Sequence, residues 1–216
     1  MSTAEARLEV LTRINRAKEG AQTPERPPYP RAAAQTREEV LHTFQDRIED
    51  YRAGFVRVAP PGLLEAVRTA LGGARRVVVP GGLDAVWLPD GLDVRRDEPF
   101  LTHAELDGAD AVVTGCAVAV ATTGTIILDH GPGQGRRVLT LVPDLHVCII
   151  RADQIVPDVL DGVQAVAAAV RAGRPLTWIS GGSATSDIEL VRVEGVHGPR
   201  RLQVIVVDGP AWRGRG

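Results

Sequence analysis

From Phe55 onwards, short apolar runs rich in β-branched residues alternate with helical patterns, and this alternation limits the chain to few folds. Arg76–Val79, Ala111–Thr114 and Leu202–Val207 are typical of buried strands, whereas Leu63–Leu71 has the apolar spacing of a helix. Apolar strands that alternate with helices form a mainly parallel sheet covered on both faces. The sequence therefore predicts a three-layer α/β domain over residues 55–216.

Three further segments of this domain carry specific predictions. Val138–Leu141 is apolar and predicts a strand, and the alanine-rich Ile155–Arg171 predicts one continuous helix. Directly before Val138, the segment Gly131–Arg137 has two glycines, Gly131 and Gly133, at the spacing of a dinucleotide-binding loop. The third glycine of that fingerprint would fall at Arg136, and no helix pattern follows. We interpret the segment as a solvent-exposed hairpin connection.

Residues 1–54 have a different character and predict a helical arm. Ser2–Glu5 and Thr36–Glu39 both fit the capping box that begins a helix, and apolar residues follow each at helical spacing. Four prolines between Thr23 and Pro30 indicate an extended linker between the two helices. Such an arm either folds back over the domain or contacts a second copy of the chain, which would make a homo-oligomer.

Composition excludes several classes of protein. The net charge of −2 gives no broad basic surface, so we expect no nucleic-acid binding. No apolar run reaches the length of a membrane span, and the first residues lack a signal sequence, which favours a cytoplasmic location. The two cysteines, Cys116 and Cys148, lie in apolar runs and are expected to be buried free thiols. The histidines lack zinc-type spacing, so no metal site is predicted.

The segment from Ser180 to Glu189 is the strongest candidate site. Gly181 and Gly182 permit a tight turn, and successive amide groups in such a turn bind anions. Four hydroxyl side chains can add hydrogen-bond donors, and two carboxylates can act as a general base or hold the loop. The hydroxyl and carboxylate residues of this segment are Ser180, Ser183, Thr185, Ser186, Asp187 and Glu189. The alternative is a structural turn whose serines and threonines bond to the backbone.

Three other segments carry polar side chains that suit a site. The turn at Gly195–Arg201 presents His197 as an acid or base, and Gly198 and Arg200 as contacts for an anion. An apolar run is interrupted at Thr123, Gly124 and Thr125. Such an interruption indicates a bulge or a close backbone approach as readily as a ligand contact. His146 is as consistent with a buried structural histidine as with a ligand contact.

Together these segments resemble the LUD-domain proteins, specifically the lactate utilization protein C family. The segments that carry the resemblance are Ala121–Thr125, Leu141–Val147, Ser180–Glu189 and Gly195–Pro199. One departure is Gly182, where the commoner form of the motif has proline. The resemblance covers roughly Phe55 to Val207, and a helical arm is also usual in the family.

The resemblance implies a fold like those of ribose-phosphate isomerase, glucosamine-phosphate deaminase and the CoA transferases. It also implies a role in the oxidation of L-lactate to pyruvate beside two partner proteins, at least one of which carries iron–sulfur clusters. Two cysteines cannot supply the usual four thiolates of such a cluster, so no redox cofactor is expected in this chain. The chain would then be a non-redox component that binds partner subunits and a small anionic ligand.

A freestanding enzyme is the competing hypothesis. It would act on a phosphorylated or acyl substrate as an isomerase or transferase, with Asp187 or Glu189 as the base and His197 or Arg200 as the electrophilic partner. That hypothesis requires these side chains to converge with Thr123 and Thr125 in one pocket. The sequence does not decide whether the chain is catalytic.

Overall fold

The computed structural model describes residues 3–20, 34–182, 184–185, 193–194 and 198–209. Contacts between residues divide the chain into two units, one of residues 1–31 and the other of residues 32–216. The first unit contains helix α1 (Thr3–Lys18), in which none of the described residues is buried. The second unit is the α/β domain. No helix in the described part of the chain is long and apolar enough to cross a membrane.

Six parallel strands form the main sheet, in the order β1-β12-β7-β4-β2-β3. Their bounds are β1 Gly54–Val58, β2 Arg76–Val79, β3 Asp93–Arg96, β4 Ala111–Thr114, β7 Leu145–Arg151 and β12 Arg201–Val207. The central strands β4 and β7 are apolar almost throughout and buried, as strands covered on both faces must be. The mainly parallel α/β fold predicted from the sequence is confirmed.

A second sheet lies beside the first and has the order β8-β5-β6-β9. Its strands are β5 Val118–Val120, β6 Thr125–Leu128, β8 Ile155–Val156 and β9 Thr177–Ile179. Strand β6 pairs antiparallel with both β5 and β9, and β8 pairs with β5 in parallel. A short antiparallel ribbon joins β10 (Ala184–Thr185) to β11 (Val193–Glu194).

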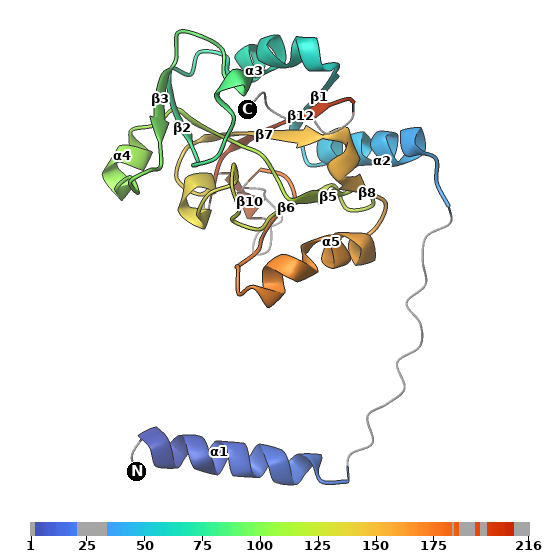
Figure 1. Ribbon diagram of the computed structural model, residues 1–216, viewed down its shortest axis with the longest axis vertical. Helices are drawn as coiled ribbons and strands as arrows, with labels where there is room; N and C mark the ends of the chain where they lie inside the picture. Colours follow the sequence, from blue (N-terminus) through green and yellow to red (C-terminus); the bar gives the residue numbers. More distant parts are fainter. Residues whose placement is uncertain (1–2, 21–33, 183, 186–192, 195–197, 210–216) are drawn as a thin grey trace. The chain divides into compact units, whose positions relative to one another are not determined.

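Helices cover both faces of this arrangement (Figure 1). Helix α3 (Leu63–Leu71) packs its buried side chains on one face of the main sheet. On the opposite face, α2 (Arg37–Asp50) and the second sheet share one core with β7 and β12. Helix α5 (Val159–Arg171) packs against the outer face of the second sheet. The short α4 (His103–Asp107) follows β3.

Helix α2 belongs to the α/β unit and not to the helical arm predicted for residues 1–54. Its apolar stripe of Val40, Leu41, Phe44 and Ile48 is almost completely buried in the core. Phe44 contacts Phe55 of β1 edge to face, with ring centroids 6.3 Å apart. The helix begins with the capping box expected at Thr36, where Thr36 and Glu39 bond to each other's backbone. The division between the units therefore lies before α2, not at residue 54.

Two predicted elements differ in the structure. Arg137–Thr140 forms a 3₁₀ helix instead of a strand, and its buried Leu139 packs with Val78 of β2 and Val112 of β4. The predicted helix of residues 155–171 begins only at Val159. Pro157 disfavours helix at the residue before it, and Asp158 caps the helix by accepting hydrogen bonds from Leu160 and Asp161.

The connection at Gly131–Arg137 also differs from the predicted exposed hairpin. It joins β6 to the 3₁₀ helix, and Gly133 and Gln134 are buried. The Gly133 N–H donates to Gly81 O at 2.8 Å, and Gly133 O accepts from the Gly115 N–H at 2.8 Å. These bonds hold the loop against the segments that follow β2 and β4.

Candidate functional site

Three hydroxyl side chains form a continuous hydrogen-bonded chain. The Oγ1 atoms of Thr123 and Thr125 lie 2.8 Å apart, and Thr125 Oγ1 lies 2.8 Å from Ser180 Oγ. Pairing of β6 with β9 positions them, because Ile126 opposite Ile179 brings the preceding Thr125 beside the following Ser180. Thr125 is buried and Ser180 is exposed, so this hydroxyl chain connects the core to the surface.

Helix α2 forms one wall beside the hydroxyl chain. Gly124 has a φ of +58°, and a Cβ atom there would lie 2.7 Å from Arg47 Cβ and 3.0 Å from the Arg47 carbonyl carbon. Gly181 has a φ of +84°, and a Cβ atom there would lie 2.6 Å from Tyr51 Cβ. Both glycines are therefore required, since another residue would be strained and would collide with the end of α2.

The turn before β12 lies against the same loop. A Cβ atom on Gly182 would be 3.0 Å from the Arg200 carbonyl oxygen, so the two backbones are close. Arg200 Nη1 lies 3.7 Å from Asp144 Oδ2, and both side chains are largely exposed. An exposed ion pair of this kind contributes little to stability, so it restrains the Arg200 side chain only weakly.

The structure thus gathers the described candidates from three separate segments. Thr123, Gly124 and Thr125 meet Ser180, Gly181 and Gly182, and Arg200 follows the half-buried Gly198 and Pro199 beside them. Thr185 belongs to β10. The candidates Ser183, Asp187, Glu189 and His197, and also Ser186, lie outside the described residues. The assignment of these residues to a ligand site remains a prediction.

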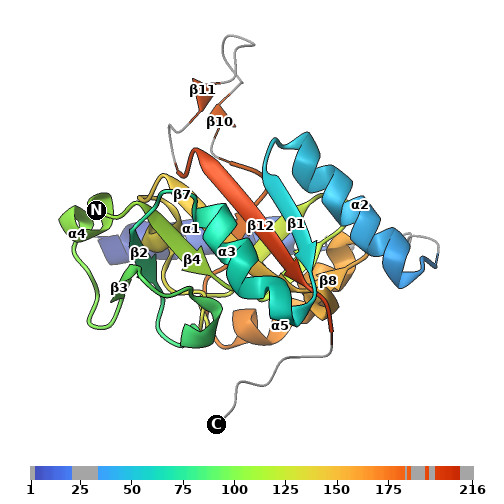
Figure 2. The ribbon, with the colours of Figure 1, turned by 90° about the horizontal axis from the view of Figure 1, so that it is seen from above.

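The gathered residues lie at the amino edge of the main sheet. Arg200 directly precedes β12, and the Arg201 N–H donates to the oxygen of Asp144, which precedes β7. Figure 2 shows the β10–β11 ribbon beyond the end of the sheet at which β12 begins. The Ser180 loop follows the carboxyl end of β9, but β9 belongs to the second sheet. The carboxyl ends of the six parallel strands lie at the other edge.

His146 is a core residue rather than part of this surface. Its ring is buried within β7, and Nε2 lies 2.8 Å from Thr114 Oγ1 on the neighbouring strand β4. Burial lowers the pKa of His146 from 6.5 to about 4, because the interior disfavours the charged ring. The two alternatives left open by the sequence are thereby resolved in favour of a neutral structural histidine.

The two cysteines are buried free thiols, as predicted. Burial and contact with Cys148 raise the pKa of the Cys116 thiol well above its ordinary value, with Cys148 the larger cause. A protonated, enclosed thiol is a poor nucleophile and a poor metal ligand. Within the described residues, no three His, Cys, Asp or Glu side chains gather in a group that could hold a metal ion.

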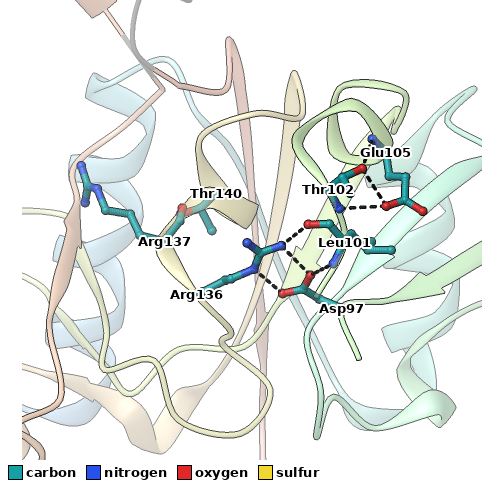
Figure 3. A network of polar contacts seen from close by, with 7 residues as sticks. All are labelled: Asp97, Leu101, Thr102, Glu105, Arg136, Arg137 and Thr140. Atoms are coloured by element: carbon teal, nitrogen blue, oxygen red, sulfur yellow. Dashed lines mark hydrogen bonds and ion pairs between the residues drawn. The ribbon is translucent and has the colours of Figure 1, made fainter. Parts of the chain in front are cut away.

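Sequence reasoning missed a polar network at the opposite edge of the sheet (Figure 3). Asp97 is only 3% exposed and accepts two hydrogen bonds from Arg136, at 2.7 and 2.8 Å. Arg136 also donates to the Leu101 carbonyl oxygen, and Asp97 accepts from the Leu101 N–H. The sequence signal that could have indicated this network is Arg136, which directly follows the glycine-rich segment of residues 131–135.

Comparisons with known proteins find similarity over nearly the whole chain. The LUD domain matches residues 22–207. A Deinococcus radiodurans protein named lactate utilization protein C is 66% identical over 95% of this chain and 97% of its own length. The Bacillus velezensis protein of the same name is 25% identical over 89% of each chain. A crystal structure of a DUF162 family protein from Deinococcus radiodurans matches with a TM-score of 0.73 and 60% identity, covering 81% of this chain and 99% of that one.

Proposed function

Since this chain belongs to the LUD-domain family, we propose that it serves in the utilization of L-lactate, as a non-redox component of the system that oxidises lactate to pyruvate. The observation that carries the proposal is the 66% identity to a protein named lactate utilization protein C, which extends over almost the full length of both chains. A similarity of that extent includes the α/β core together with the segments that carry Thr123, Thr125 and Ser180.

The non-redox role is supported by the ligands that the chain can offer. It has two cysteines, and both are buried free thiols within the core. An iron–sulfur cluster ordinarily requires four thiolates, so these cysteines cannot hold one. The electrons from lactate would therefore pass to iron–sulfur clusters in partner subunits, and this chain would bind those subunits.

The proposed ligand of this component is a small anion, bound where the hydroxyl chain reaches the surface. Ser180 and Thr123 offer hydroxyl donors, and Arg200 offers a guanidinium that is paired only loosely with Asp144. A carboxylate suits this combination, because hydroxyl groups and a guanidinium can bond to both of its oxygens.

Growth on lactate tests the role of the chain. Deletion of its gene should abolish growth with L-lactate as the sole carbon source and leave growth on pyruvate unchanged. The wild-type gene supplied in trans should restore growth. A variant with both Ser180→Ala and Arg200→Ala should restore it poorly, whereas Arg68→Ala, on the exposed surface of α3, should act as wild type. Normal growth of the deletion strain on L-lactate would contradict the proposal.

Partner binding has its own test. The tagged full chain should co-purify from lactate-grown cells with a protein whose absorbance and iron content indicate iron–sulfur clusters. The same purification from cells of a strain that lacks that protein provides the control. Recovery of the chain alone at every salt concentration would contradict the proposed association.

A further inference from the structure

At the carboxyl edge of the main sheet, the connections that follow the neighbouring strands β2 and β4 run in opposite directions. From β2 the chain continues to β3 on one side, whereas from β4 it continues to β7 on the other. The first connection packs with α3, and the second forms the sheet on the opposite face. In open α/β sheets, ligands bind in the crevice beyond the strand ends at such a point.

The glycine-rich loop of residues 131–135 closes the floor of this crevice. Gly133 bonds to Gly81 after β2 and to Gly115 after β4, so the loop spans both strand ends. Gly82 has a φ of +76°, and a Cβ atom on it would lie 2.8 Å from Pro132 Cβ. The three backbones therefore approach closely, and residues beside them line one space.

That space is an open cleft of about 640 Å³. Gly81 and Gly82 line one side, Glu98 and Phe100 follow β3 on the next, and His130 and Arg136 flank the glycine-rich loop. Its volume is in the range of small-molecule sites in proteins. It shares no lining residue with the hydroxyl chain of Thr123, Thr125 and Ser180.

Phe100 forms a supported aromatic surface at the rim of the cleft. Its side chain is 75% exposed, although it is one of only three phenylalanines in the chain. The Arg136 guanidinium carbon lies 4.8 Å from the ring centroid, and Asp97 fixes that guanidinium with two hydrogen bonds (Figure 3). One face of the ring is therefore braced by a cation, and an aromatic ligand can stack on the ring's exposed surface.

The charges in the cleft disfavour an anion. Asp97 neutralises Arg136, which leaves the exposed Glu98 carboxylate as an additional negative group and hydrogen-bond acceptor. Burial, and to a lesser degree Arg137, lower the pKa of His130, so its ring adds no positive charge at neutral pH. Carboxylate oxygens accept hydrogen bonds and cannot donate them, so the ligand must supply N–H or O–H groups.

We propose that this cleft binds a planar heteroaromatic ring with N–H donors, of the kind found in adenine nucleosides. The ring would stack on the exposed surface of Phe100, and its amino group would donate to the Glu98 carboxylate. This binding goes beyond the role in lactate utilization and does not depend on it. It assigns the ligand to the carboxyl edge of the sheet, opposite the hydroxyl chain.

Calorimetric titration of the full chain with adenosine tests the proposal. Wild type should bind adenosine, and Phe100→Ala should weaken binding roughly tenfold or more, since a base stacked on an aromatic side chain contributes about 1–3 kcal/mol. Phe100→Trp should retain binding because it keeps an aromatic surface. Val86→Ala, an exposed apolar residue outside the cleft lining, is the matched control and should bind as wild type.

Two further titrations separate stacking from hydrogen bonding. N6,N6-dimethyladenosine keeps the ring but lacks the amino donors, so it should bind wild type several-fold more weakly than adenosine. Glu98→Gln should reduce that difference between the two ligands. Because Phe100 is exposed, its variants should unfold at the wild-type temperature. Absence of adenosine binding to wild type at millimolar concentration, or equal binding by Phe100→Ala, would overturn the proposal.

Discussion

His146 links the stability of the fold to pH, because its buried ring is neutral in the native state. Its pKa is about 4 when folded and near 6.5 when exposed, so the unfolded chain binds more protons between these values. Stability is then full above about pH 6.5 and falls as the pH drops toward 4. We expect the free energy of unfolding in urea to decrease by roughly 2 kcal/mol between pH 7 and pH 5 from this residue.

Substitution isolates that contribution. His146→Gln should be less stable than wild type at pH 7 and should show a flatter decline between pH 7 and pH 5. His42→Gln provides the control, because the His42 side chain on α2 is largely exposed and its loss should leave the decline as in wild type. If wild type and His146→Gln lose the same free energy over this interval, the histidine is not buried in neutral form.

Gly124 allows a second test at the residue scale. Gly124→Ala introduces a side chain at a φ of +58° and places it 2.7 Å from Arg47 Cβ, so we expect a loss of about 2 kcal/mol or more. Gly173 has a φ of +76° with open space around it, so Gly173→Ala should cost only about 1 kcal/mol. Urea unfolding of both variants measures the difference. Equal losses would show that the contact with α2 is absent.

At the scale of elements, local signals predicted some boundaries and missed others. The capping box at Thr36 correctly located the start of α2, because cap residues act within one turn. The apolar, alanine-rich sequence predicts one helix over residues 155–171, because its helical spacing continues across Pro157. Val138–Leu141 read as a strand because its apolar run fits either period, and only contacts with β2 and β4 favour the 3₁₀ turn.

The cap of α2 gives the prediction at this scale. Thr36→Ala should lower the free energy of unfolding by about 1 kcal/mol, because the helix loses a side-chain bond to its first turn. Thr69→Ala, at an exposed position inside α3, removes a hydroxyl of the same kind without a cap and should change stability little. A cost at Thr36 no larger than that at Thr69 would contradict the capping role.

At the scale of the whole molecule, the sequence located main-sheet strands such as Arg76–Val79 and Ala111–Thr114, but not the edge to which each loop belongs. The Ser180 loop follows strand β9, which belongs to the second sheet and not to the parallel one. Pairing between distant strands decides this, and no local pattern reports it. Thr123, Ser180 and Arg200 come from three segments that lie close together, and their role in ligand binding stays a prediction.

The two units give a prediction about truncation. A chain that begins at residue 34 should fold and unfold at the wild-type temperature, because residues 1–31 form a unit of their own. A chain that begins at residue 55 should fail to fold, since it lacks Phe44, Ile48 and the rest of the α2 stripe in the core. Circular dichroism and thermal unfolding measure both. Cooperative unfolding of the shorter chain would show that α2 is dispensable.

The proposed role of the whole molecule in lactate oxidation is tested most directly by following electrons. Purified chain is mixed with L-lactate and an artificial electron acceptor, first alone and then with the iron–sulfur proteins that co-purify with it. We expect no reduction of the acceptor by the chain alone. With the mixture, we expect lactate-dependent reduction that falls when the chain is omitted. Sustained lactate oxidation by the isolated chain would contradict the non-redox role.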